Sequence, residues 1–213
     1  MNGRDLTLGI VAGLAVVGLA RQRGSADRER GMLVPISKPS WVRSIFDDSA
    51  WFAFSHLPDD VCVERRFSTN MGLFASWNVF TKGRSGQNFQ NFSGLLTGNE
   101  IAPRETLPYC AKGLDALREQ TGAPIRGLFH VGSLELDRPH RGRGIARALY
   151  RNMVTFTAEH GLAVAPGACY RDPDQPHLGR GSTTQAAQRI WEDLSKEFPH
   201  TRARTRLLLW GGQ

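Results

Sequence analysis

The chain has 213 residues, which is enough for one domain with a proper hydrophobic core plus extensions. Its formal net charge of +7 favours anionic partners, and coenzyme A, nucleic acid and acidic lipid all meet that condition. The three cysteines are odd in number and widely spaced. They match neither a metal-ligand pattern nor a disulfide framework, so we predict no metal site and a reducing compartment.

The N-terminal stretch Leu6–Ala20 is uncharged and apolar all round. It is shorter than the roughly 20 residues that a helix needs to span a bilayer. Gly9 and Gly13 have the G-x-x-x-G spacing that lets membrane helices pack closely. We therefore predict an apolar helix over residues 6–20 that contacts either a membrane or a protein surface, this domain or another subunit, and both alternatives stay open.

The residues that follow are polar and charged without an apolar period, and they predict a basic linker. We accordingly expect an N-terminal helix and linker over residues 1–34 and a folded domain over residues 35–213. Arginines after the apolar stretch outweigh Arg4, so membrane insertion would leave the domain on the cytoplasmic side. The expected location is cytoplasmic, with membrane association as the alternative.

The pattern of apolar and turn-forming residues predicts helices, strands and a loop between residues 40 and 125. They are a helix from Trp41 to about His56 capped by Ser40, two strands at Val61–Phe67 and Leu73–Phe80, a Gly- and Asn-rich loop from Lys82 to Gly98, and a helix within Glu105–Gln120.

An apolar, partly alternating run at Leu128–Leu136 predicts a buried strand. The run breaks at residues 137–140, and apolar residues then recur at helical spacing from Ile145 to Phe156. A strand that enters a helix through a glycine-bearing turn leaves free backbone N–H groups at the positive end of the helix dipole, where phosphate binds well. The turn is neither a P-loop, which needs Gly-Lys-Ser/Thr, nor a dinucleotide fingerprint, because Arg147 stands where the third glycine belongs.

The turn Arg141-Gly142-Arg143-Gly144-Ile145-Ala146 instead matches the pattern [Q/R]-x-x-G-x-[G/A]. At these residues the sequence resembles the GNAT family of acetyl-CoA-dependent N-acetyltransferases; the alternative is a basic turn on an unrelated α/β domain. The resemblance implies that the turn binds the coenzyme A pyrophosphate and that the preceding strand hydrogen-bonds the pantetheine arm. The cofactor-binding residues that it implies are Leu134, Leu136, Arg141, Gly142, Arg143, Gly144, Ile145 and Ala146.

The rest of the chain predicts a strand at Leu162–Ala165, a helix that a Ser182–Gln185 capping box begins, and an edge strand over Thr201–Trp210. The order of elements is similar to the GNAT fold over about residues 40–210. The expected fold class is mixed α/β, a GNAT-like central mixed sheet flanked by helices with an apolar N-terminal helical extension.

Catalysis in such a site needs a base, and two candidates lie on the predicted strand. Some family members place a glutamate six residues before the last apolar residue of this strand, and the same count from Leu136 gives His130. An imidazole can serve as a base at neutral pH. Glu135 is the second candidate, on the opposite side by simple alternation unless a bulge intervenes. A core histidine without a catalytic role is the alternative for His130.

The family often uses a tyrosine as the acid, and Trp191 stands at that place here. An indole N–H is no acid at physiological pH, so this departure puts catalysis in doubt. The expected function is transfer of an acetyl group from acetyl-CoA to an unknown primary amine. The alternative is a non-catalytic assembly or virion component with a GNAT-like fold, whose N-terminal helix contacts membrane or subunits. Nucleic-acid binding rests on charge alone, and we do not expect it.

Overall fold

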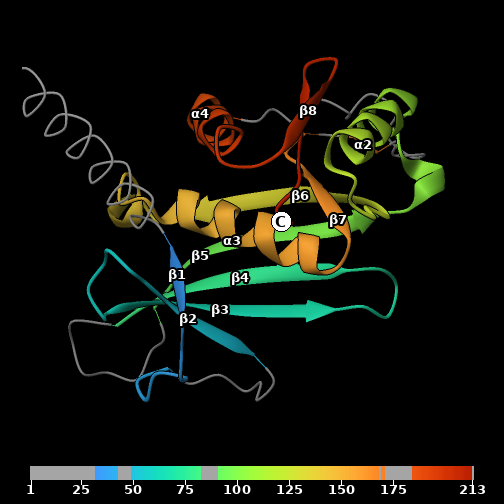
Figure 1. The fold of residues 1–213 in the computed structure, drawn as a ribbon. Helices are drawn as coiled ribbons and strands as arrows, with labels where there is room; N and C mark the ends of the chain where they lie inside the picture. Colours follow the sequence, from blue (N-terminus) through green and yellow to red (C-terminus); the bar gives the residue numbers. More distant parts are fainter. Residues whose placement is uncertain (1–31, 43–48, 83–90, 168, 171–183, 213) are drawn as a thin grey trace, which may run out of the picture.

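A mixed nine-stranded sheet forms the centre of the molecule (Figure 1). The computed structural model describes residues 32–42, 49–82, 91–167, 169–170 and 184–212. The strands lie in the order β1-β2-β3-β4-β5-β6-β7-β9-β8, and the β6–β7 pair is parallel whereas the other pairs are antiparallel. Their bounds are β1 Leu33–Ile36, β2 Ala50–Phe54, β3 Val61–Ser68, β4 Phe74–Thr81, β5 Asn91–Ile101, β6 Gly127–Leu136, β7 Leu162–Ala165, β8 His200–Ala203 and β9 Arg206–Leu209.

The described ranges contain three α-helices: α2 Pro108–Thr121, α3 Ile145–Glu159 and α4 Gln185–Leu194. Two short 3₁₀ turns lie at Pro103–Glu105 and Arg138–His140. The mixed α/β class is therefore confirmed. Among these helices none combines the length and apolar character needed to cross a bilayer. The predicted helix over residues 6–20 lies outside the described residues.

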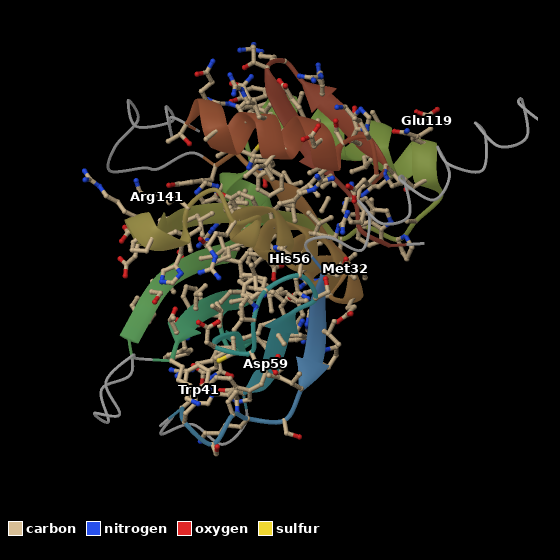
Figure 2. The ribbon with its side chains drawn as sticks, turned by 90° about the vertical axis from the view of Figure 1, so that its left-hand side faces the viewer. Met32, Trp41, His56, Asp59, Glu119 and Arg141 are labelled. Carbon is tan, nitrogen blue, oxygen red and sulfur yellow. A yellow bond between two sulfur atoms is a disulfide. The ribbon has the colours of Figure 1, made fainter. Side chains whose placement is uncertain are left out.

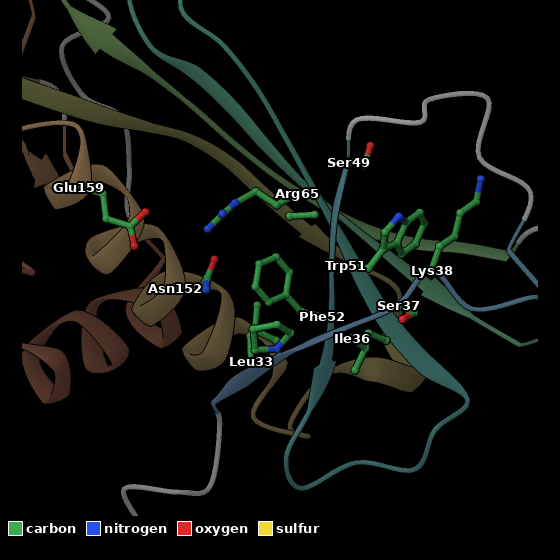
Figure 3. A pocket seen from close by; sticks show the side chains of 12 residues that line it. Leu33, Ile36, Ser37, Lys38, Ser49, Trp51, Phe52, Arg65, Asn152 and Glu159 are labelled. Carbon is green, nitrogen blue, oxygen red and sulfur yellow. The ribbon is translucent and has the colours of Figure 1, made fainter.

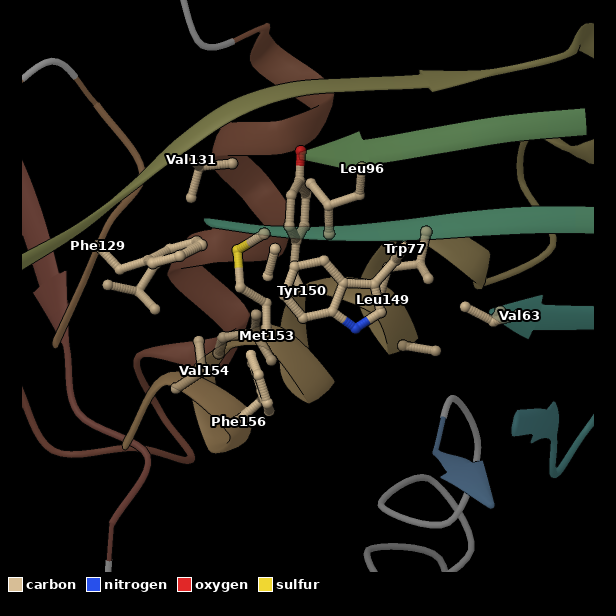
Figure 4. Packing of buried hydrophobic residues seen from close by; sticks show 14 of the residues in the cluster. Val63, Trp77, Leu96, Phe129, Val131, Leu149, Tyr150, Met153, Val154 and Phe156 are labelled. Atoms are coloured by element: carbon tan, nitrogen blue, oxygen red, sulfur yellow. The ribbon is translucent and has the colours of Figure 1, made fainter. Parts of the chain in front are cut away.

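Two hydrophobic clusters hold helices against opposite faces of the sheet. On one face α3 packs on β4 and β6, where Met153 lies among Trp77 and Phe129 (Figure 4), and Trp191 of α4 joins the same cluster. On the other face Leu117 of α2 packs with Leu128 of β6 and with residues of β7 and β9. Complete burial of one such side chain contributes about 1.5–3 kcal/mol, so these two clusters account for the layering.

The predicted helix over Trp41–His56 is wrong for its second half, because residues 50–54 form β2. Trp51 and Phe52 lie on opposite faces of the sheet, Trp51 in a small cluster with Cys62 and Phe52 in the main core. Aromatic residues suit a pleated surface, and pairing with β1 and β3 outweighs the weak helical spacing. Residues 43–48 lie outside the described residues.

The predicted loop over Lys82–Gly98 is wrong from residue 91 onward, because Asn91–Ile101 is β5. Its glycines mark close approach rather than a loop. A Cβ added at Gly98 would lie 2.2 Å from Cε1 of Phe129, and one at Gly94 would lie 2.5 Å from Cδ2 of Leu136. The side chains of β6 thus cross over β5 at positions where only glycine fits.

Two further expectations are corrected at the C-terminal side of the sheet. The segment predicted as one edge strand is the β8–β9 hairpin, with Arg204 at φ +58° in its turn and β9 inside the sheet. The cysteines were expected to be unpaired, but Cys110 and Cys169 form a disulfide with 5.7 Å between their Cα atoms. A separation of 59 residues gives no signal in the sequence; the pair forms because α2 packs near the end of β7.

Candidate functional site

The parallel strands β6 and β7 separate halfway along β6. Residues Gly127–His130 of β6 pair with Leu162–Ala165 of β7, and β7 ends there at Pro166-Gly167. The other edge of β6 stays paired with β5 as far as Leu136. The C-terminal half of β6 therefore has one edge without a β7 partner, and its peptide groups there are available to a ligand.

A pocket of about 590 Å³ lies beside this open half of β6. The predicted site residues Leu134, Glu135, Leu136 and Arg141 line it together. The wall is completed by residues of β5, of the end of β6 and of the start of α4: Phe92, Ser93, Gly94, Asp137, Thr184 and Ala186. The volume falls in the range of small-molecule and cofactor sites. Three distant parts of the chain thus meet at the place where the strand is open.

The glycine turn connects this pocket to the start of α3. Gly142 and Gly144 have φ values of +74° and +79°, in the left-handed region that favours glycine. No side chain caps α3, so the first N–H groups, from Ile145 onward, lack an intrahelical partner. The exposed Arg141 lies at the end of β6 (Figure 2), where its Nε donates to the carbonyl oxygen of Leu136 at 2.9 Å. The turn therefore presents backbone donors and positive charge together.

His56, from the loop after β2, holds the glycine turn in place through a hydrogen bond. Its Nε2 donates to the carbonyl oxygen of Arg143 at 2.8 Å, and a Cβ added at Gly144 would lie 2.9 Å from the same nitrogen. The buried His140 accepts from Nη1 of Arg143 at 3.2 Å. Sequence reasoning missed His56 because it lies 87 residues from its partner and no local pattern connects them.

A β-bulge changes the relation between the two candidate bases. Leu96 of β5 pairs with Leu134, but Gly98 pairs with Val131, so two residues of β6 oppose one residue of β5. With this extra residue, alternation places Glu135 on the same face of β6 as His130. The expectation of opposite sides is therefore wrong. The two side chains remain about 15 Å apart along the strand, so they cannot act on one proton.

His130 is the last residue of β6 that pairs with β7, at the point where the strands separate. Its ring lies edge-on to Tyr170, with 4.8 Å between the ring centroids. Its Nδ1 is buried and has no hydrogen-bond partner in the described part of the chain. Burial lowers the pKa of His130, and a hydrogen bond with the backbone of Gly167 works in the opposite direction. Burial thus favours the neutral imidazole, although the ring does not line the pocket.

Trp191 lies in the core and not in the pocket. Its indole is buried and stacks on Tyr150 with 4.3 Å between ring centroids. Burial raises the pKa of Tyr150 to about 12, so this phenol is a weak acid. Neither group supplies an acid at this position. Ile145, a predicted cofactor-binding residue, has its side chain in the core, so its backbone N–H alone faces the turn.

No cluster of three or more His, Cys, Asp or Glu residues suited to a metal ion occurs in the described ranges. Comparisons with family models, curated proteins and solved structures found no match to this chain. The open strand, the pocket and the turn are therefore the features from which we infer a function.

Proposed function

We propose that this chain is an N-acetyltransferase that transfers an acetyl group from acetyl-CoA to a primary amine. The observation that carries the proposal is the pocket beside the open half of β6, which Arg141 lines at the beginning of the glycine turn that precedes the uncapped α3. An elongated ligand with an anionic end and an amide-bearing arm fits this arrangement. The resemblance of residues 141–146 to the GNAT turn supports the same ligand.

The pyrophosphate binds at the turn, where the backbone N–H groups of residues 142–146 and the positive end of α3 stabilise negative charge. Arg141 adds a full positive charge beside them. The pantetheine arm runs back along β6 and pairs with the peptide groups of Leu134 and with the N–H of Leu136, whose carbonyl oxygen already accepts from Arg141. The arm therefore passes Glu135, and the thioester lies toward the bulge near His130.

In the proposed reaction the amine nitrogen attacks the thioester carbonyl carbon and forms the new C–N bond. The C–S bond breaks, and coenzyme A leaves as its thiolate. His130 is the proposed base, because its neutral imidazole can accept the proton that the amine loses. Backbone N–H groups of the open strand stabilise the developing oxyanion. A thiolate leaves readily without protonation, which accommodates a tryptophan at position 191.

Calorimetry with acetyl-CoA on the full chain tests the proposal through two matched glycine substitutions. Gly142 and Gly122 both have positive φ, and a Cβ added at either meets no atom within 4 Å. Each change to alanine therefore costs a similar strain of about 1–2 kcal/mol. We expect Gly142→Ala to weaken acetyl-CoA binding about tenfold, because the new methyl group crowds the pyrophosphate, whereas Gly122→Ala at the end of α2 retains wild-type affinity. Absence of acetyl-CoA binding to the wild-type protein would overturn the proposal.

The buried position of Trp191 favours one second candidate, a GNAT-like protein that binds coenzyme A without catalysis. Such a protein would serve assembly or membrane contact through its N-terminal segment. Turnover distinguishes the two candidates. Release of free coenzyme A that depends on a primary amine, after the hydrolysis measured without amine is subtracted, supports the enzyme. Tight acetyl-CoA binding without amine-dependent release supports the non-catalytic protein.

A further inference from the structure

A second pocket, of about 720 Å³, lies between β1, β2 and the C-terminal half of α3 (Figure 3). It shares no lining residue with the pocket beside β6. Leu33 and Ile36 of β1 and Phe52 of β2 form an apolar part of its wall, and polar side chains enter from β3 and α3. The proposed acetyltransfer gives this pocket no role.

Two cations line this pocket, Lys38 after β1 and Arg65 of β3, and the guanidinium of Arg65 stacks on aromatic rings. Its Cζ lies 4.1 Å from the ring centroid of Phe156 and 5.0 Å from that of Phe52. Its Nε is buried without a hydrogen-bond partner, and the side chain forms no hydrogen bond or ion pair with another described residue. An anion in the pocket that bonds the Nη groups of this guanidinium would supply the charge-assisted hydrogen bonds that the side chain lacks among the described residues.

Some other arginines of the described chain bond carboxylates. Arg126 bonds both carboxylate oxygens of Glu100, and Arg147 and Arg151 share Glu197. Arg65 bonds no carboxylate in the described ranges; burial lowers its pKa, and the charge of Glu159 acts in the opposite direction. An arginine held by aromatic rings and left without an anion is a binding group for an external carboxylate.

Two side chains of α3 face Arg65 across the pocket (Figure 3). Asn152 accepts from Nε1 of Trp77 at 2.8 Å, which orients its amide and leaves the NH₂ group as a donor. Glu159 is an exposed carboxylate that forms no ion pair with Arg65. A positive and a negative group thus face one cavity with an apolar wall.

We propose that this second pocket binds a free amino acid with a branched apolar side chain. The carboxylate bonds the guanidinium of Arg65, the ammonium lies at Glu159, and the side chain packs on Leu33 and Phe52. Phosphate fits less well, because Glu159 repels a dianion more strongly and the apolar wall gains nothing from it. A plain carboxylic acid lacks a partner for Glu159.

Binding to the full chain in the absence of acetyl-CoA tests this site with four probes. L-Leucine carries both charges, 4-methylpentanoate lacks the ammonium, 3-methylbutylamine lacks the carboxylate, and inorganic phosphate lacks the apolar body. By calorimetry we expect L-leucine to bind most tightly, 4-methylpentanoate several-fold more weakly, and the amine and phosphate not measurably. Tighter binding of phosphate than of L-leucine, or no binding of L-leucine at millimolar concentration, overturns the proposal.

Variants assign the binding to the named groups. Arg65→Gln should weaken L-leucine about tenfold or more, because a charge-assisted pair is lost. The control Arg104→Gln removes the same charge from an arginine that is 88% exposed, and it should change nothing. Glu159→Gln should abolish the preference for L-leucine over 4-methylpentanoate. If Arg65→Gln fails to fold, Ser49→Trp fills the pocket from its rim, and unchanged affinity in that variant contradicts the proposal.

Discussion

At the scale of single residues, His130 lies where β6 and β7 separate, and its buried Nδ1 has no hydrogen-bond partner among the described residues. If it is the base, His130→Ala should lower kcat by about 10²-fold or more and leave acetyl-CoA affinity nearly unchanged. Because burial lowers its pKa, kcat/KM should rise with pH through an inflection below the ordinary value of 6.5. Stopped-flow rates over pH 4.5–9 measure both effects, and unchanged turnover would move the role to Glu135 or to water.

The same residue makes stability depend on pH. Its folded pKa lies below its unfolded pKa, so the unfolded chain binds more protons between the two values. The contribution of His130 to stability is therefore fully present above about pH 6.5 and is lost as the pH falls. His130→Gln should flatten this part of a urea-unfolding series measured from pH 7.5 down to pH 5. An unaltered slope would show that His130 does not titrate differently in the two states.

His56 tests whether the turn must be held in place for binding. His56→Ala removes the hydrogen bond to Arg143, which is worth about 0.5–1.5 kcal/mol, so acetyl-CoA should bind roughly 2- to 10-fold more weakly. His200→Ala is the matched control, because Nδ1 of His200 also bonds a backbone oxygen, that of Phe198, at 3.3 Å. Equal affinities for the two variants in calorimetry would exclude a positioning role for His56.

At the scale of elements, the sequence predicted what local periodicity determines. The strand at 128–136 and the helix from Ile145 were found because their apolar residues repeat at the spacing of the element. β2 was missed because its aromatic residues also fit a helical spacing, and β5 because its glycines are typical of a loop; pairing with neighbouring strands decides both. Two features of the candidate site depend on tertiary structure and leave no signal in the local sequence. One is the hydrogen bond of His56 to the glycine turn, and the other is the β-bulge of β6 opposite Thr97.

The crossing of β5 and β6 makes a prediction about stability. Gly98→Ala should destabilise the fold by about 1–3 kcal/mol, because its Cβ would clash with Phe129 and with the carbonyl oxygen of His130 at 2.6 Å. Gly127→Ala is the control, since its Cβ would meet Cδ2 of Leu162 at 3.3 Å, a contact that a flexible side chain accommodates. Urea-unfolding midpoints compare the two, and a loss in Gly127→Ala as large as in Gly98→Ala would contradict the close-approach argument.

At the scale of the whole molecule, the described part of the chain begins just before β1. β1 begins at Leu33, whose side chain packs against the main hydrophobic cluster of the described residues. The polar stretch from Arg21 onward separates this core from the apolar residues 6–20. An uncharged apolar segment of that kind forms an unusually large exposed patch if it is left in water.

Deletion of residues 1–24 should therefore distinguish a segment that contacts a membrane or another subunit from one that belongs to the core of the domain. We expect the truncated domain to keep its melting temperature and its acetyl-CoA affinity, because the cut falls in polar sequence before β1. If residues 6–20 serve as an anchor or assembly element, truncation should also raise solubility and abolish flotation with anionic vesicles or self-association in size-exclusion chromatography. Unfolding of the truncated chain would instead make the segment part of the core, and both the membrane and the assembly hypotheses would then be wrong.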